Sequence, residues 1–117
     1  VKGKFKSKGK NEAEKKKLIK DAKSLEDSGA FGIVLECIYS EISKQITHII
    51  KIPTIGIGAS VHCDGQVLVT DDILGLTDAK IKFVKKYTNI KKVMNLAVSK
   101  FKKEVKSKKY PTQKYSY

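Results

Sequence analysis

Hydrophobic positions near the start of the chain recur at the spacing of an α-helix. The positions concerned are Leu18, Ile19, Ala22 and Leu25. Asn11 stands before this pattern and can cap a helix, and Glu12 and Glu14 would lie in its electropositive first turn. Gly29 follows the last apolar position and is a common stop residue. The pattern therefore predicts a helix from Glu12 to about Gly29, preceded by ten lysine-rich residues that form a loop or a frayed strand.

Three short apolar runs have the length of strands rather than helices. The first runs from Gly32 to Leu35 and ends at the acid Glu36, the second covers residues 54–57, and the third covers residues 66–69. Runs of this kind are typical of parallel strands, and the first is expected to be buried on both faces.

A second helix is predicted from Glu41 to Ile50, opened by Ser40 and followed by the helix breaker Pro53. From Asp78 to about Lys108 the chain predicts one or two basic amphipathic helices, with Asn89 as a break or a cap and a polar tail from Tyr110. The inner stripe of this region would be Val93, Leu96, Ala97, Phe101 and Val105.

Strands that alternate with helices imply a parallel sheet with crossover connections, and hence an α/β fold. A chain of 117 residues holds one domain at most. Three parallel strands cannot close a barrel, and the chain begins with Val1 rather than Met. We therefore expect residues 1–117 to form a single partial domain, with basic helices and a tail in residues 78–117.

The basic charge of the chain comes from lysine alone. The formal net charge is +13, and all 25 basic residues are lysine. Nucleic-acid surfaces usually include arginine, because its planar fork binds phosphate and guanine at two points. We interpret the excess of lysine as compositional drift, which makes nucleic acid an unlikely partner.

Targeting features are absent from the sequence pattern. No apolar stretch approaches the 18 residues of a membrane span, and the lysine-rich start lacks the apolar centre of a signal peptide. The two cysteines, Cys37 and Cys63, fit no paired metal-ligand spacing and suggest a reducing compartment. The expected location is cytoplasmic, without membrane association.

Several sequence blocks occur in a distinctive order. They are Ser28-Gly29-Ala30-Phe31, Ile33-Val34-Leu35-Glu36-Cys37, Ile52-Pro53-Thr54-Ile55-Gly56-Ile57-Gly58-Ala59, Cys63-Asp64-Gly65-Gln66-Val67-Leu68-Val69, Asp72-Ile73-Leu74-Gly75-Leu76, Lys82-Phe83-Val84-Lys85-Lys86-Tyr87 and Tyr110-Pro111. In this order and spacing the chain resembles ketopantoate hydroxymethyltransferases, from the end of their fifth barrel strand onward. The resemblance implies a partial β/α (TIM-type) barrel, in which the three apolar runs are about the last three strands.

The resemblance also implies a reaction. In this family 3-methyl-2-oxobutanoate is bound to Mg²⁺, a base removes a proton from the carbon next to the keto group, and the enolate attacks the one-carbon unit of methylenetetrahydrofolate. The ligands of the Mg²⁺ lie on earlier strands, so no metal ligand is expected in this chain. The expected partners are therefore the missing amino-terminal half or a family homo-oligomer, and the isolated chain is expected to be inactive.

Glu36 is the leading catalytic candidate, because the carboxyl ends of barrel strands carry the chemistry and proton abstraction beside a carbonyl needs a base. By resemblance Glu36 matches the general acid/base glutamate of the family. From the residues alone, an ion pair between this strand-end acid and one of the many lysines is the favoured explanation, because structural ion pairs are common.

The turn that follows the second apolar run supplies the other candidates. Gly56, Gly58 and Ala59 are expected beside the substrate or cofactor, where glycines let the backbone approach a ligand, although a routine turn explains them equally well. The family's glycine after this block is replaced by Ser60. His62 and Asp64 are two residues apart, but two ligands without a third make a poor metal site.

Two other classes of function stay open at this point. One is a non-catalytic lysine-rich binding fragment that contacts nucleic acid or acidic protein. The other is an interaction remnant that joins the oligomer of a full-length family member.

Overall fold

The computed structural model describes residues 6–78 and 80–117, and the chain divides into two compact units. The sheet unit contains the residues up to Leu68 together with Lys80–Val84, and the helical unit contains the segment from Val69 and the segment Lys85–Tyr117.

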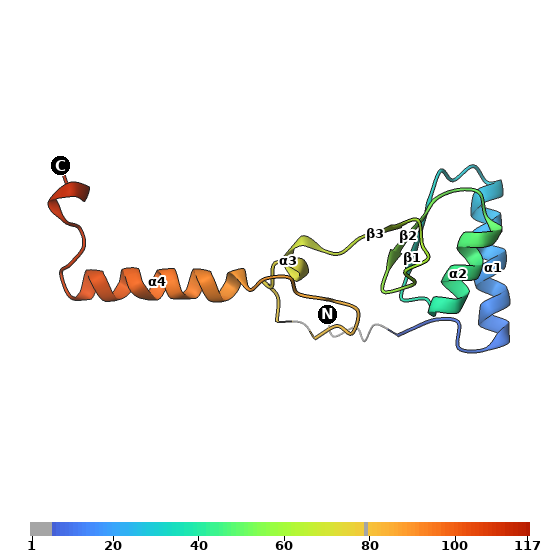
Figure 1. Ribbon diagram of the computed structural model, residues 1–117, viewed down its shortest axis with the longest axis horizontal. Coiled ribbons are helices and arrows are strands. Elements are labelled where there is room, and N and C mark those ends of the chain that lie inside the picture. The colour runs from blue at the N-terminus through green and yellow to red at the C-terminus, as the bar shows by residue number, and fades with distance from the viewer. Residues whose placement is uncertain (1–5, 79) are drawn as a thin grey trace. The chain divides into compact units, whose positions relative to one another are not determined.

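A parallel three-stranded sheet forms the centre of the sheet unit (Figure 1). Its strands are β1 (Ile33–Glu36), β2 (Thr54–Ile57) and β3 (Gly65–Gln66), in the order β1-β2-β3. In the register of the first pair, Ile33 lies opposite Thr54 and Glu36 lies opposite Ile57. The predicted α/β class and parallel pairing are confirmed.

Two helices, α1 (Glu12–Asp27) and α2 (Ser40–Ile49), lie side by side on the same side of the sheet (Figure 1). The Asn11 side chain caps α1 by accepting a hydrogen bond from the Glu14 backbone N–H at 2.8 Å, as the sequence predicted. Both helices agree with their predicted bounds to within about two residues, the usual uncertainty of a helix end.

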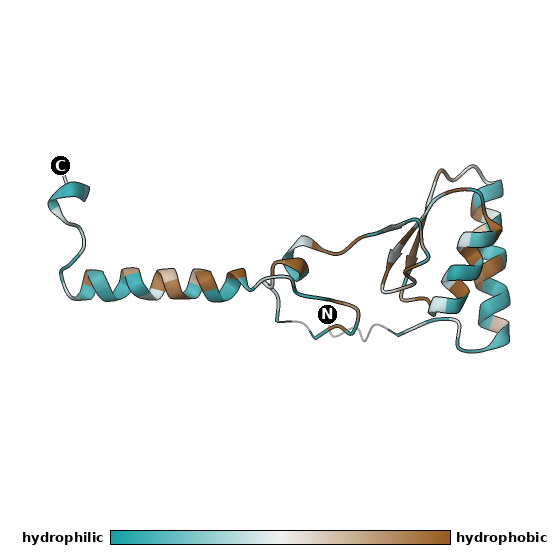
Figure 2. Ribbon diagram, viewed as in Figure 1, coloured by the Kyte–Doolittle hydropathy of each residue, from teal (hydrophilic) through white to brown (hydrophobic). Residues whose placement is uncertain are grey.

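The hydrophobic core lies between these helices and one face of the sheet (Figure 2). The buried apolar residues are Ala22, Ile33, Leu35, Ile38, Ile42, Ile46, Ile50 and Cys63. Along β1, Ile33 and Leu35 are buried whereas Val34 and Glu36 are exposed. The prediction of burial on both faces was therefore wrong for β1. Its helix-covered face is packed, whereas on its opposite face, here called the open face, Val34 and Glu36 are exposed in the part of the chain that the structure describes.

The third strand is shorter than predicted, because β3 ends at Gln66 and residues 67–69 are not strand. It follows β2 through a loop of seven residues, 58–64, without a crossover helix. Parallel neighbours usually need a connection of a dozen residues or more, so this connection is short.

The helical unit contains α3 (Thr70–Ile73), α4 (Ile90–Lys106) and the short 3₁₀ helix η1 (Gln113–Tyr115). The sequence pattern did not predict α3. The predicted helix from Asp78 was wrong before Asn89, where the chain instead returns to α3: the Tyr87 N–H donates to the Ile73 carbonyl at 2.9 Å, and the Ile90 N–H to Leu74 at 2.9 Å. Asn89 does cap α4, since its side chain accepts from the Lys92 N–H at 2.9 Å.

The predicted inner stripe of α4 is not buried within the helical unit. Val93, Leu96 and Phe101 are all more than half exposed, and none of the α4 residues is buried. Apolar residues nevertheless recur along the helix (Figure 2). Among the helices of the described residues, none combines the length and apolar character that a membrane span requires.

Candidate active site

Glu36 is the last residue of β1, and its side chain belongs to the open face of the sheet. The alternation along the strand places it on the same face as Val34, which is 61% exposed. Its register partner is Ile57, the last residue of β2. Glu36 therefore lies at the carboxyl edge of the sheet, next to the turn that holds the other candidate residues.

The Glu36 carboxylate is not held in an ion pair by the described part of the chain. The three ion pairs found there involve Glu12, Asp78 and Glu104. The alternative reading of Glu36 as the acid partner of a nearby lysine therefore lacks support, and the carboxylate is exposed at the strand end.

The two candidate glycines make room for protein side chains. A Cβ atom on Gly56 would lie 2.8 Å from the Gln66 Oε1 atom and 3.1 Å from the Cys63 Sγ atom. Gly58 has a φ of +63°, and a Cβ atom there would lie 2.6 Å from the Phe83 ring. Close packing is thus sufficient to explain both glycines, whereas their predicted place beside a ligand stays a prediction.

The residues after Gly58 anchor the loop to the core. Ala59 is half-buried and packs against the hydrophobic core. Ser60 is 2% exposed. Its hydroxyl accepts hydrogen bonds from the Ser40 hydroxyl at 3.1 Å and the His62 N–H at 3.2 Å, and its carbonyl accepts from the Gln66 side chain at 2.7 Å. The serine at this position therefore organises the loop through its side chain, a role that sequence analysis did not assign.

Asp64 fastens the far end of the same loop to the start of β2. Its carboxylate accepts hydrogen bonds from the Thr54 N–H at 2.8 Å and the Thr54 hydroxyl at 3.1 Å, and these bonds lower the pKa of Asp64. The Asp64 N–H donates back to the Thr54 hydroxyl at 3.2 Å. Asp64 is thus a structural residue, as its turn-like sequence suggested, while His62 is exposed.

The backbone beside Glu36 has an arrangement that the sequence did not reveal. Cys37 adopts a left-handed conformation with a φ of +55°. Its N–H donates to the Ile57 carbonyl at 3.0 Å, and its carbonyl accepts from the Lys8 N–H at 2.8 Å. Burial, followed by the neighbouring Glu36 charge, raises the pKa of the Cys37 thiol, which therefore stays protonated at neutral pH.

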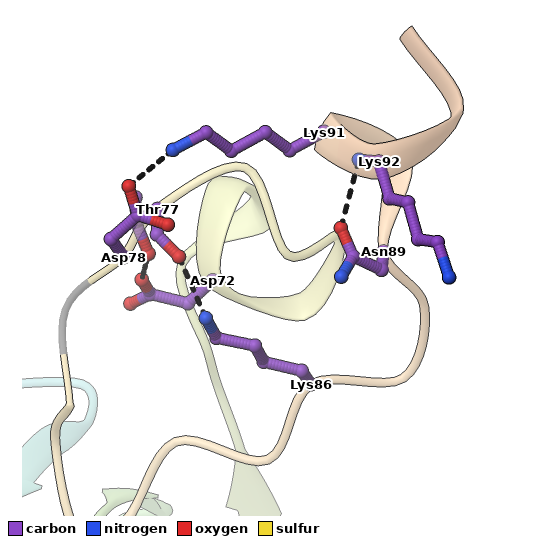
Figure 3. A network of polar contacts seen from close by, with 7 residues as sticks. All are labelled: Asp72, Thr77, Asp78, Lys86, Asn89, Lys91 and Lys92. Atoms are coloured by element: carbon purple, nitrogen blue, oxygen red, sulfur yellow. Dashed lines mark hydrogen bonds and ion pairs between the residues drawn. The ribbon is translucent and has the colours of Figure 1, made fainter. Parts of the chain in front are cut away.

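A separate polar network organises the helical unit (Figure 3). The Thr77 hydroxyl donates to the buried Asp72 carboxylate at 2.7 Å, and the Lys86 ammonium donates to the Thr77 carbonyl at 2.7 Å. Lys91 pairs with Asp78. These contacts connect the turn after α3 to the start of α4 and account for Asp72 structurally.

The described residues do not gather a metal site. No group of three or more His, Cys, Asp or Glu side chains in residues 6–78 and 80–117 lies close enough to share a metal ion. A bound Mg²⁺ would need at least part of its ligand set from elsewhere.

Comparison of the sequence with known protein families shows which family the chain belongs to. A family model described as ketopantoate hydroxymethyltransferase matches residues 1–113. The chain belongs to the ketopantoate hydroxymethyltransferase family. The resemblance expected from the sequence blocks is thereby confirmed.

Curated relatives named 3-methyl-2-oxobutanoate hydroxymethyltransferase are similar over almost the whole chain. The protein from Pelagibacter ubique is 60% identical over 97% of this chain, and one from Clostridium botulinum is 53% identical over 98%. One from Pyrobaculum aerophilum is 44% identical over 97%. The matched region is 44%, 42% and 43% of these relatives, respectively, so the chain spans less than half of their length.

Proposed function

We propose that this chain contributes the Glu36 region to the active site of a hydroxymethyltransferase that acts on 3-methyl-2-oxobutanoate. Membership of the family supports the reaction class. The observation that carries the assignment within this chain is the exposed Glu36 carboxylate at the carboxyl end of β1, which forms no ion pair with any other described residue. Residues at the carboxyl ends of the strands carry the chemistry of β/α barrels.

The architecture we propose is part of a β/α barrel. Barrel strands are covered by helices on the outside and present their other face to the interior. One-sided burial of β1, with α1 and α2 on the covered face, agrees with this arrangement. The open face with Val34 and Glu36 would then point into the barrel interior, where other strands would cover it.

In the proposed mechanism Glu36 exchanges a proton with the carbon next to the keto group of the substrate. As a carboxylate it accepts the proton, and the electron pair of the C–H bond becomes that of the enolate. The enolate carbon then forms a bond to the one-carbon unit, which the family's methylenetetrahydrofolate would supply. The two C–N bonds that hold this unit to the folate break, water supplies the hydroxyl oxygen of the product, and the two nitrogens take up the proton removed from the substrate and one proton from that water. The described residues do not fit a Mg²⁺ site by themselves, so no step is derived through the metal.

The test uses a chimera in which this chain replaces the matching region of the Pelagibacter ubique relative, which is 60% identical to it. Exchange of the substrate's C–H proton with deuterium is measured by NMR, alongside hydroxymethyl transfer. We expect the chimera to be active and Glu36→Gln to lose on the order of 100- to 10,000-fold in exchange rate. Glu41→Gln removes an exposed acid from the first turn of α2 and is the matched control.

The possible results separate clearly. An active parent with an unaffected Glu36→Gln variant would remove Glu36 from the mechanism. An inactive parent that folds and binds the keto acid would count against the assignment of the reaction to this chain. The chain assayed alone is expected to transfer no hydroxymethyl group.

A further inference from the structure

The strand that carries Glu36 changes faces immediately after it. In a regular strand, residues two positions apart share a face, so Ile38 would lie with Val34 and Glu36 on the open face. Ile38 is instead 9% exposed and belongs to the core on the covered face. The backbone at residue 37 must therefore interrupt the alternation of side chains between the two faces of the sheet.

Cys37 provides this interruption through its left-handed backbone, with a φ of +55°. Pairing on both sides holds the conformation. The Cys37 N–H donates to Ile57 of β2, while Lys8 pairs on the other side by donating to the Cys37 carbonyl and by accepting from the Tyr39 N–H at 3.1 Å. The Ser43 hydroxyl also donates to the Ile38 carbonyl at 3.4 Å and to the Tyr39 carbonyl at 3.2 Å.

A non-glycine residue in the left-handed region is uncommon, and its strain persists only where the surrounding structure determines it. Here the strain coincides with the residue next to the proposed base. We infer that Cys37 is a positioning residue, whose left-handed backbone keeps the Glu36 carboxylate on the open face while Ile38 stays anchored in the core. This inference rests on the proposed role of Glu36.

The inference makes a distinction between side chains at position 37. Asparagine and glycine enter the left-handed region readily, whereas a β-branched residue strongly resists it. Valine at this position would favour an extended backbone. Because Ile38 is held in the core, the change in the backbone at residue 37 would then reorient Glu36. The carboxylate would then leave the position from which it reaches the substrate carbon.

The experiment compares Cys37→Val with Cys37→Asn in the active chimera, by kcat, KM and the deuterium-exchange rate. We expect Cys37→Val to lower kcat by on the order of tenfold to a hundredfold with little change in KM, the scale of a misplaced catalytic group. Cys37→Asn should keep a kcat close to that of the parent. In a Glu36→Gln background, Cys37→Val should cost nothing further, since the group it positions is already gone.

Lys108→Val is the matched control. Lys108 is the other described non-glycine residue with positive φ, at +53°, and it follows α4 in the helical unit. Its substitution imposes a similar backbone strain at a position outside the sheet unit, so kcat should stay at the parent value.

The outcomes distinguish this inference from the proposed function. Equal kcat for Cys37→Val and Cys37→Asn in an active chimera would overturn the positioning role alone. A further loss by Cys37→Val in the Glu36→Gln background would also overturn it, because the effect would not pass through Glu36. If Cys37→Val fails to fold, Cys37→Ala against Cys37→Gly gives the same comparison with a smaller side chain. Inactivity of the folded parent would overturn the proposed function and this inference with it.

Discussion

Replacing Gly58 with alanine tests whether the turn after β2 is determined by packing. Two separate costs arise at this position. The left-handed φ of +63° disfavours any L-residue by about 1–2 kcal/mol, and the lower entropy of the unfolded chain returns about 0.4–1 kcal/mol. The added Cβ atom would lie 2.6 Å from the Phe83 ring, and overpacking of this kind costs about 1–3 kcal/mol. The expected loss in the free energy of unfolding is therefore about 1–4.5 kcal/mol, centred on about 3 kcal/mol.

Gly29→Ala isolates the first of these costs. Gly29 has a φ of +90°, but a Cβ atom there would meet nothing within 4 Å. This variant should lose only about 1 kcal/mol. Urea unfolding of the chimera, followed by circular dichroism, gives both values from the midpoints and slopes.

Phe83→Ala provides the decisive comparison. If the ring is the obstacle, Gly58→Ala should cost less in a Phe83→Ala background, with a coupling of about 1–3 kcal/mol in the double-mutant cycle. Equal losses for Gly58→Ala and Gly29→Ala, together with zero coupling, would refute the steric argument. A stable Gly58→Ala variant that loses only activity would instead favour the ligand-adjacent reading of Gly58.

Three further predictions concern other parts of the chain. Asp64→Asn should lower the free energy of unfolding at pH 7, because the depressed pKa of Asp64 stabilises the fold above the ordinary aspartate pKa of about 3.9. The difference from the parent should shrink as the pH falls below that value and the carboxylate is protonated. Thermal unfolding at pH 7 and in acid measures this difference, and a pH-independent difference would contradict the prediction. Asn89→Ala should destabilise α4 by about 1 kcal/mol, seen as lower helicity in circular dichroism, whereas Asn89→Asp should retain the cap. Binding to a mixed single-stranded oligonucleotide at physiological salt should be weak and independent of sequence, despite the net charge of +13, and submicromolar sequence-dependent binding by fluorescence anisotropy would reject the interpretation of the lysines as drift.

Local patterns were sufficient for the elements whose own residues determine them. Helix α1 follows from its apolar spacing and from the Asn11 cap, and β2 follows from a short apolar run after Pro53. The segment before Asn89 was mispredicted because its backbone hydrogen bonds go to Ile73 and Leu74, partners that periodicity cannot identify. Similarly, one-sided burial of β1 depends on what covers the sheet, which the strand's own apolar character does not encode.

In the candidate site, too, local sequence determines some features and tertiary contacts determine others. The position of Glu36 at a strand end was predictable, because the apolar run stops there. The left-handed backbone of Cys37 was not predictable, since cysteine has no preference for that conformation. The backbone hydrogen bonds to Lys8 and Ile57 impose the conformation. The side chains that fill the space beside Gly56 and Gly58 come from Gln66 and Phe83, at sequence distances that only the fold brings together.

The short connection between β2 and β3 has a consequence for the order in which the sheet can form. Ile55 pairs with Gly65, ten positions later, whereas Ile33 pairs with Thr54, 21 positions later. Closing the shorter loop costs about 0.7 kcal/mol less in chain entropy. The reciprocal bonds of Thr54 and Asp64 close that loop at its base. The parallel β2–β3 pair is therefore the favoured first contact of the sheet during folding, and the strand that carries Glu36 joins a pair of strands that has already formed.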